Sequence, residues 1–309
     1  MNMIIEDIKE KHGVCTNEIT ARMITGTKKS IIWFCWNGNS CLVPGDVFLC
    51  ALLERAMNRG GKLIFNGSVS SRLANLLPQI QEALLKNDNR LRPVDIVIKT
   101  VLDIAPQKKR NEILIHGSFF NRDIDTLYTL LKRQDTINNL LVFHGDYLGS
   151  YLKKYQHRRH IKYQTSVLNK HFLEAATNVN GLYKSKNGEV NLDNPLLVAA
   201  ISLIYSHKFS ILYIPLSNNS ELRRNDCVYD LINAFLKETG PALIPHGSDV
   251  TEYDKINAIA SNNLFTEALR ICWENPTRSY NCGRCLNCTR KDDPIKTVAR
   301  WGFKATQKR

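Results

Sequence analysis

Short apolar runs alternate with longer amphipathic stretches along most of this 309-residue chain. In the first third, three runs have the length and the β-branched or aromatic content of strands: residues 30–36, 62–65 and 93–98. Two stretches carry apolar side chains at helical spacing, over residues 44–57 and 68–85. Gly60-Gly61 ends the first of these helices. We therefore expect a smaller α+β region over residues 1–108.

From residue 112 the chain alternates regularly between strand-like and helix-like segments. The expected strands are residues 113–116, 140–144, 172–177 and 210–214. The expected helices are residues 125–133, a segment within 149–169, and residues 195–206. Such alternation favours a parallel sheet that is covered by helices on both faces. We expect an α/β fold, with a doubly wound parallel sheet over residues 109–265 and a linker at residues 106–110.

The loops at the carboxyl ends of the strands are the first places to look for a ligand site, because parallel α/β sheets bind their ligands there. These loops follow His116, His144, Thr177 and Ile214. His144 ends its strand and is followed by Gly145, so both are candidate ligand contacts. A histidine that is satisfied within the core is the competing interpretation of His144.

Four cysteines near the C-terminus have the spacing of a metal site. Cys272, Cys282, Cys285 and Cys288 form the pattern C-x9-C-x2-C-x2-C. Four thiolates match the tetrahedral preference of Zn²⁺, and a shell closed by four cysteines is typical of a structural site. An iron–sulfur cluster and unliganded thiols are the alternatives. We expect residues 266–309 to form a zinc knuckle followed by a helical basic tail.

The chain is strongly basic, with a formal net charge of +13. Such a balance favours polyanionic partners, including nucleic acid and nucleotides. The densest basic cluster spans residues 153–160 and includes a tyrosine, as sites that combine phosphate contacts with base stacking do. A solvated helix face would have the same composition. The sequence therefore leaves nucleic-acid binding open.

The first residues lack both a basic region and a cleavable apolar segment, and no apolar run has the length of a membrane span. We therefore expect a cytoplasmic protein with no membrane partner. The nine cysteines are an odd number, which fits reduced thiols better than a disulfide framework.

Four segments together resemble a known family. The stretch Gly117-Ser118-Phe119-Phe120-Asn121-Arg122-Asp123-Ile124-Asp125-Thr126 looks like the phosphate loop (PP-loop) of the ATP-pyrophosphatase superfamily, in which Phe-Phe-Ser-Gly-Gly-x-Asp-Ser opens a helix. The stretches ending in Phe143-His144-Gly145-Asp146 and starting at Ile244-Pro245-His246-Gly247-Ser248 also fit. The Cys-Gly-x-Cys-x-x-Cys segment resembles that of 7-cyano-7-deazaguanine synthases. The similarity covers about residues 110–302.

This resemblance implies a particular chemistry. Members of the family use ATP with Mg²⁺ to adenylate a carboxylate, release pyrophosphate and let an amine attack, and the synthases continue to a nitrile on a deazaguanine. Asp125 and Thr126 match the Asp and Ser of the loop and would be the catalytic residues. The residues implied to bind the cofactor are Asn121, Arg122, Asp123, His144, Gly145, His246, Gly247 and Ser248. A nucleotide or a deazapurine-like small molecule would be the ligand.

The phosphate loop of this chain is degenerate. The Ser-Gly-Gly of the family falls on Asn121, Arg122 and Asp123. In working enzymes the glycines let backbone N–H groups close around pyrophosphate at the helix N-terminus. Arg122 adds bulk there, and Asp123 adds a negative charge close to the phosphates. Asp125 itself would also suit the role of an ordinary helix N-cap.

The loop after the last matching strand also has two interpretations. His246, Gly247 and Ser248 would contact ligand by resemblance. Thr251 with Asp254 is equally a plausible capping pair for the helix that begins near Thr251.

Three functions follow from the sequence. The chain is an ATP-dependent synthase that releases pyrophosphate and AMP, or a non-catalytic relative that binds a nucleotide, a nucleobase or a partner protein, or a nucleic-acid-binding accessory protein of a modification or defence system. Residues 121–123 separate the first two. A homo-oligomer or a protein complex is compatible with each of them.

Overall fold

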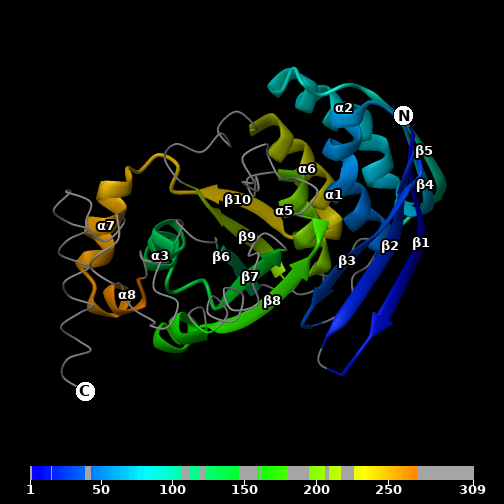
Figure 1. Cartoon of the computed structure of the whole chain (residues 1–309). Coiled ribbons are helices and arrows are strands. Elements are labelled where there is room, and N and C mark those ends of the chain that lie inside the picture. Colours follow the sequence, from blue (N-terminus) through cyan, green and yellow to red (C-terminus); the bar gives the residue numbers. More distant parts are fainter. Residues whose placement is uncertain are drawn as a thin grey trace.

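The computed structural model describes residues 2–14, 16–38, 43–105, 112–117, 123–145, 159, 162–179, 195–205, 209–216 and 226–269. Within these residues, ten strands form one continuous sheet in the order β10-β9-β6-β7-β8-β3-β2-β1-β4-β5 (Figure 1). The strands are β1 (Met3–His12), β2 (Asn17–Thr25), β3 (Lys28–Trp36), β4 (Gly61–Ser70), β5 (Val94–Leu102), β6 (Glu112–Gly117), β7 (Asn139–Gly145), β8 (His171–Thr177), β9 (Phe209–Pro215) and β10 (Ala242–His246).

The helices that accompany the sheet are α1 (Pro44–Arg59), α2 (Ser71–Asn87), α3 (Asp123–Lys132), α5 (Pro195–Ile204), α6 (Asp226–Thr239), α7 (Glu252–Ala260) and α8 (Asn263–Ala268). Residues 162–167 are also helical. Local sequence sets several of these boundaries. Pro44 stands at the start of α1, where its missing N–H would have had no helical partner. Ser70 caps α2, because its side chain accepts a hydrogen bond from the Leu73 N–H.

The C-terminal half of the sheet is wholly parallel. Strands β8, β7, β6, β9 and β10 lie in that spatial order, so the chain moves outward from β6 first in one direction and then in the other. Helix α3 contacts α7 and α8, while α5 contacts α1 and α6. In Figure 1 these two groups lie on opposite faces of the sheet. The expected α/β class is confirmed, and the arrangement is compatible with a doubly wound fold.

This strand order creates a switch point between β6 and β9. Parallel α/β sheets commonly bind ligands at the carboxyl ends of the two strands beside such a point. The start of α3, the end of β9 and the end of β10 all lie at this edge of the sheet.

The N-terminal half joins the same sheet through one antiparallel pairing, between β3 and β8. Phe34, Cys35 and Trp36 face Thr177, Ala176 and Ala175. Side chains reinforce this junction: the Thr177 hydroxyl donates to the Trp33 carbonyl at 2.5 Å, and the Tyr205 hydroxyl donates to the Glu174 carbonyl at 2.8 Å. Residues 1–108 and 109–265 thus contribute strands to a single sheet.

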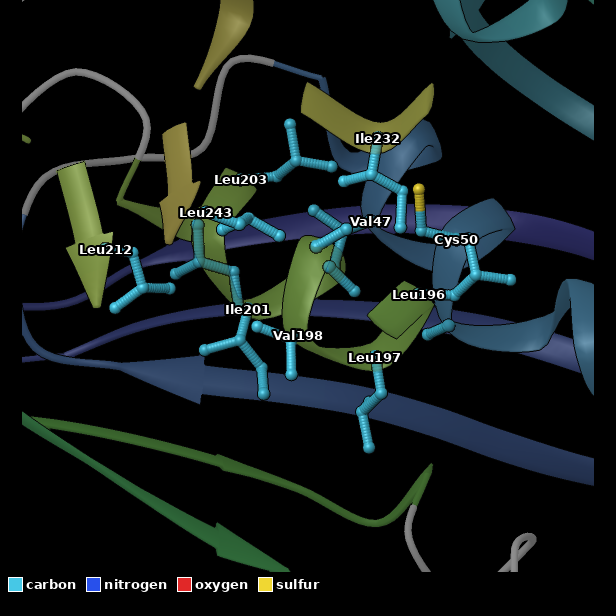
Figure 2. Close-up of a cluster of buried hydrophobic side chains, with 14 of the residues drawn as sticks. Val47, Cys50, Leu196, Leu197, Val198, Ile201, Leu203, Leu212, Ile232 and Leu243 are labelled. Atoms are coloured by element: carbon cyan, nitrogen blue, oxygen red, sulfur yellow. The ribbon is translucent and has the colours of Figure 1, made fainter. Parts of the chain in front are cut away.

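On one face of the sheet the core lies between the strands and helices α1, α5 and α6. All ten residues of α5 are buried. Figure 2 shows Leu196, Leu197, Val198, Ile201 and Leu203 gathered with Val47 and Cys50 of α1, Ile232 of α6, and Leu212 and Leu243 of the neighbouring strands. Burial of this much apolar surface is the main force that holds α1 and α5 together across the junction.

Helix α1 is also anchored to β4 at close range. A Cβ on Gly45 would lie 1.8 Å from the Ser68 carbonyl oxygen, so only glycine permits this approach. The next residue, Asp46, is 1% exposed, and one of its carboxylate oxygens accepts the Ser70 N–H at 2.8 Å. Burial raises the pKa of Asp46 to about 6.

Most expected elements are present, and the differences have physical causes. The strands expected at residues 30–36, 62–65 and 93–98 correspond to β3, β4 and β5, and each is longer than expected. Strands β1 and β2 and helices α6 and α8 were not expected from the sequence. The expected linker at 106–110 lies outside the described residues. No helix in the described part of the chain combines the length and apolar character needed to cross a bilayer.

Candidate functional site

The carboxyl ends of β9 and β10 and the first turn of α3 meet at one place on the sheet edge. There Lys255 of α7 reaches inward. Its Nζ donates to the Asp125 Oδ1 at 2.6 Å and to the Leu216 carbonyl oxygen at 2.5 Å. The two side chains are 1% and 7% exposed. One ammonium group therefore ties together three segments that are far apart in the sequence.

Gly247 turns the chain beside this lysine. The residue has a φ of 84°, in the left-handed region that favours glycine. A Cβ there would lie 3.4 Å from both the Cε and the Nζ of Lys255, and 3.5 Å from a ring carbon of Tyr128. The glycine that the resemblance assigned to ligand binding thus has a structural role as well: it turns the chain tightly over the buried ion pair.

His246, the last residue of β10, is the second polar group of the site. Its Nδ1 shares a hydrogen bond of 3.1 Å with the Thr129 hydroxyl, and its carbonyl accepts the Leu216 N–H at 2.9 Å. The ring lies 6.0 Å from the rings of both Tyr128 and Tyr213. Burial and the nearby Arg133 guanidinium lower the pKa of His246 below its ordinary value. A lowered pKa favours the neutral imidazole at pH 7.

Exposed cations flank these aromatic rings. The Lys132 Nζ lies 5.7 Å from the Tyr128 ring centre, and the Arg133 guanidinium lies 5.6 Å from that of Tyr213. Both residues are exposed at the end of α3. Asp249 is the opposing charge, since it acts to raise the pKa of His246. Two exposed cations beside a half-buried histidine suit an anionic ligand.

The structure brings together some of the residues predicted from the sequence. The Lys255 Nζ that binds Asp125 lies 5.9 Å from the centre of the Tyr128 ring, and the centre of the His246 ring lies 6.0 Å from the same point. Thr126 is 5% exposed. Helix α3 begins at Asp123, so Asp125 lies inside the first turn rather than at the N-cap, which corrects the capping interpretation.

For the other predicted residues the structure gives a backbone position, a degree of burial or no description. His144 and Gly145 are the last residues of β7, where they pair with Ala176 and Thr177 of β8. Asp123 contributes its backbone to α3, and Ser248 is half-buried in the loop after β10. Asn121 and Arg122 fall outside the described residues. Of the basic cluster at 153–160, only Arg159 is described, and it is exposed.

The capping pair predicted at the start of the last matching helix is confirmed. The Thr251 hydroxyl oxygen accepts the Asp254 N–H at 3.1 Å, and the hydroxyl donates to the Asp254 carboxylate at 2.6 Å. This cap starts α7 at Glu252 and so fixes the position from which Lys255 enters the site.

Lys255 is the functional candidate that the sequence analysis missed. A signal for it exists: Lys255 lies one and four residues before the buried Ile256 and Ile259. That spacing places the lysine on the apolar face of α7, where a charged residue has to be paired. Its partner, 130 residues away, is visible only in the folded chain.

The four cysteines of the proposed zinc knuckle lie outside the described residues. Among the residues that are described, no group of three or more His, Cys, Asp or Glu side chains is arranged to hold a metal ion. The zinc site therefore stays a prediction from spacing.

The zinc prediction is tested by metal content. We expect one zinc per chain, held by Cys272, Cys282, Cys285 and Cys288. Because folding of such a segment is coupled to metal binding, Cys285→Ser is expected to lower both zinc content and the melting temperature. Cys227→Ser, at an exposed cysteine of α6, is the matched control and should change neither. Stoichiometric zinc after replacement of all four cysteines would show that the metal, if present, binds elsewhere.

Comparison with known protein families, curated proteins and solved structures finds no match for this chain. The fold and the site define it as an α/β protein with a mostly parallel sheet and a buried lysine–aspartate pair at the switch point.

Proposed function

We propose that this chain is a zinc-binding relative of the 7-cyano-7-deazaguanine synthases that binds a nucleotide or a nucleobase without using it for adenylation. The fold supports a ligand at the switch point, where the resemblance also places the phosphate loop. The proposal distinguishes ligand binding from adenylation, because adenylation requires Asp125 to be available to ATP and Mg²⁺ and binding of a nucleobase does not.

The observation that carries the proposal is the Lys255–Asp125 ion pair. By resemblance, Asp125 is the carboxylate of the phosphate loop. In this chain it is 7% exposed, and a lysine ammonium lies 2.6 Å from its Oδ1. The Leu216 carbonyl oxygen is a second acceptor for the same ammonium. Two oxygen acceptors are thus occupied by an internal cation of the chain, so Asp125 is a poor ligand for the Mg²⁺ that accompanies ATP.

The degenerate phosphate loop also argues against adenylation. Side chains at Arg122 and Asp123 replace the glycines that leave backbone N–H groups free to surround pyrophosphate. A carboxylate at residue 123 would repel phosphates. Loss of the loop and occupation of Asp125 together favour the non-catalytic relative over the synthase.

The surroundings of His246 support a ring-bearing ligand. Because its Nδ1 is engaged with Thr129, a neutral imidazole would present Nε2 to a ligand. Tyr128 and Tyr213 flank the imidazole, and Lys132 and Arg133 place positive charge beside their rings. A purine or deazapurine, with or without a phosphate, has the complementary chemistry.

Titration calorimetry combined with a pyrophosphate assay tests the proposal. We expect ATP with Mg²⁺ to bind weakly or not at all, and pyrophosphate release across a panel of carboxylates to stay at background. Guanine, 7-deazaguanine derivatives and their nucleotides are expected to bind in the absence of Mg²⁺, and His246→Ala is expected to weaken that binding. Lys237→Ala, at an exposed position of α6, is the matched control.

Two outcomes would contradict this proposal. Micromolar ATP affinity with steady AMP production by the unmodified protein would restore the synthase. Failure of the whole purine and deazapurine panel, with zinc present, would exclude nucleobase binding at this site. Restoring Ser-Gly-Gly at residues 121–123 distinguishes loss of the loop from occupation of Asp125: recovery of ATP binding in that variant would assign the loss to the loop alone.

A further inference from the structure

Strand β5 is an edge of the ten-stranded sheet and is open to solvent along most of its length. Val97, Val101 and Leu102 are 40%, 51% and 41% exposed. An edge strand presents unpaired backbone N–H and C=O groups, and proteins usually protect such an edge with charge or cover it. The charged side chains of β5 disfavour pairing with another strand in most registers, but one register is compatible with them.

Two opposite charges flank Val97 symmetrically. Asp95 lies two residues before it and Lys99 two residues after it, and both are exposed. Because side chains alternate along a strand, all three point to the same face of the sheet. This face also carries Ile64 of β4, which is in register with Val97, and Ile4 of β1, which is in register with Ile64. An apolar row therefore reaches the open edge between the two charges.

A second copy of the same strand has the complementary pattern. When two β5 strands pair antiparallel about a two-fold axis at Val97, Asp95 of each copy faces Lys99 of the other. Val97 then faces its own counterpart, and Ile96 faces Ile98 on the opposite face of the sheet. Opposite charges directly across an antiparallel pair stabilise it, and like charges destabilise it.

Charge selects this register over its neighbours. An axis at Asp95 or at Lys99 places like charges opposite each other. An axis at residue 96 or 98 places a charge opposite Val97. Only the axis at Val97, among these five, matches every exposed charge with its opposite. The ion pair within the chain, between the Lys62 Nζ and the Asp95 Oδ2 at 3.4 Å, leaves the Asp95 side chain 68% exposed, so it remains accessible to a second cation.

We propose that β5 is a homodimer interface, through which two copies of this chain join their sheets edge to edge about a two-fold axis at Val97. The proposal does not depend on the function of the ligand site. The dimer places the two switch points toward opposite ends of one extended sheet, because six strands separate β5 from β6 in each copy.

A pair of charge reversals tests this arrangement. Lys99→Asp gives a strand with two acidic positions, and Asp95→Lys gives a strand with two basic positions. Each variant alone faces like charges at both contact points, so we expect its dimer dissociation constant to rise by at least about tenfold. An equimolar mixture of the two variants has opposite charges at both points and is expected to form a heterodimer. Sedimentation velocity measures all three samples.

The controls separate the interface from folding. Lys28→Asp makes the same charge change at an exposed position of β3 and is expected to leave the dimer intact. Recovery in the mixture shows that each variant is folded. Hydrogen exchange of residues 94–102 is expected to slow as the protein concentration rises. A monomeric wild-type protein at its highest soluble concentration, or a dimer that neither charge reversal weakens, would overturn the proposal.

Discussion

Replacing Lys255 with methionine is expected to lower the free energy of unfolding by about 3–5 kcal/mol, the usual cost of breaking a buried ion pair by removing one partner. Methionine preserves most of the aliphatic volume, so the loss reports the charge rather than a cavity. The Asp125 carboxylate, 7% exposed, would be left without its counter-ion, and the Leu216 carbonyl would lose its donor. Urea unfolding at pH 7 measures the effect.

A double variant shows whether the penalty belongs to the pair. Asp125→Leu in the Lys255→Met background removes the second charge and is expected to recover a large part of the stability. Lys237→Met, at an exposed position of α6, is the control for loss of a lysine and should change stability little. If Lys255→Met costs less than about 1 kcal/mol, as exposed pairs do, the pair is effectively solvated and cannot keep Asp125 from a ligand.

The second large effect is a pH dependence of folding stability that arises from Asp46. The pKa of this carboxyl rises from 3.8 to about 6 in the folded protein because the group is buried. Below pH 3.8, the pKa of Asp46 in the unfolded chain, Asp46 is protonated in both the folded and the unfolded state. The full contribution of its protonation to the free energy of unfolding is then present. Between 3.8 and about 6 the unfolded state loses the proton first, so stability falls as pH rises, and above about 6 the contribution is lost.

Asp46→Asn isolates this contribution. Asparagine stays neutral and can still accept the Ser70 N–H, so its stability relative to wild type is expected to improve between pH 4 and pH 6 and then level off. The shift corresponds to about 3 kcal/mol. Asp135→Asn, at an exposed carboxylate after α3, is the control. Chemical denaturation across this pH range provides the comparison. A difference between wild type and Asp46→Asn that does not change with pH would show that Asp46 remains ionised in the fold.

Strands and helices were predictable from the sequence where the element is buried on all sides, or where buried residues recur at the spacing of a strand or a helix. Strands β6 to β9 are short apolar runs, and α5 is apolar around its whole circumference because it is buried on all sides. Strands β1 and β2 were missed because charged residues occupy the half-buried face, as Glu6 and Arg22 do in their ion pair. The signal was nevertheless present in β2, whose residues alternate strictly between buried and half-buried positions.

The candidate site was predictable only in part, and for a different reason. Resemblance directed attention to Asp125 and His246, both of which belong to the site. It did not identify Lys255, because the meaning of a lysine on an apolar helix face depends on which carboxylate lies opposite it. That pairing is decided by how α7 packs against α3, and no local pattern records it.

The junction between β3 and β8 also sets an order of events during synthesis. Trp33 and Thr177 are 144 residues apart, so β3 leaves the ribosome long before its partner strand exists. Until β8 is made, β3 is an edge strand with Ile32, Phe34 and Trp36 on one face. A contact at such separation forms late and slowly. The nascent N-terminal half is therefore the stage at which this protein is most exposed to misassembly, and the stage that chaperones would have to protect.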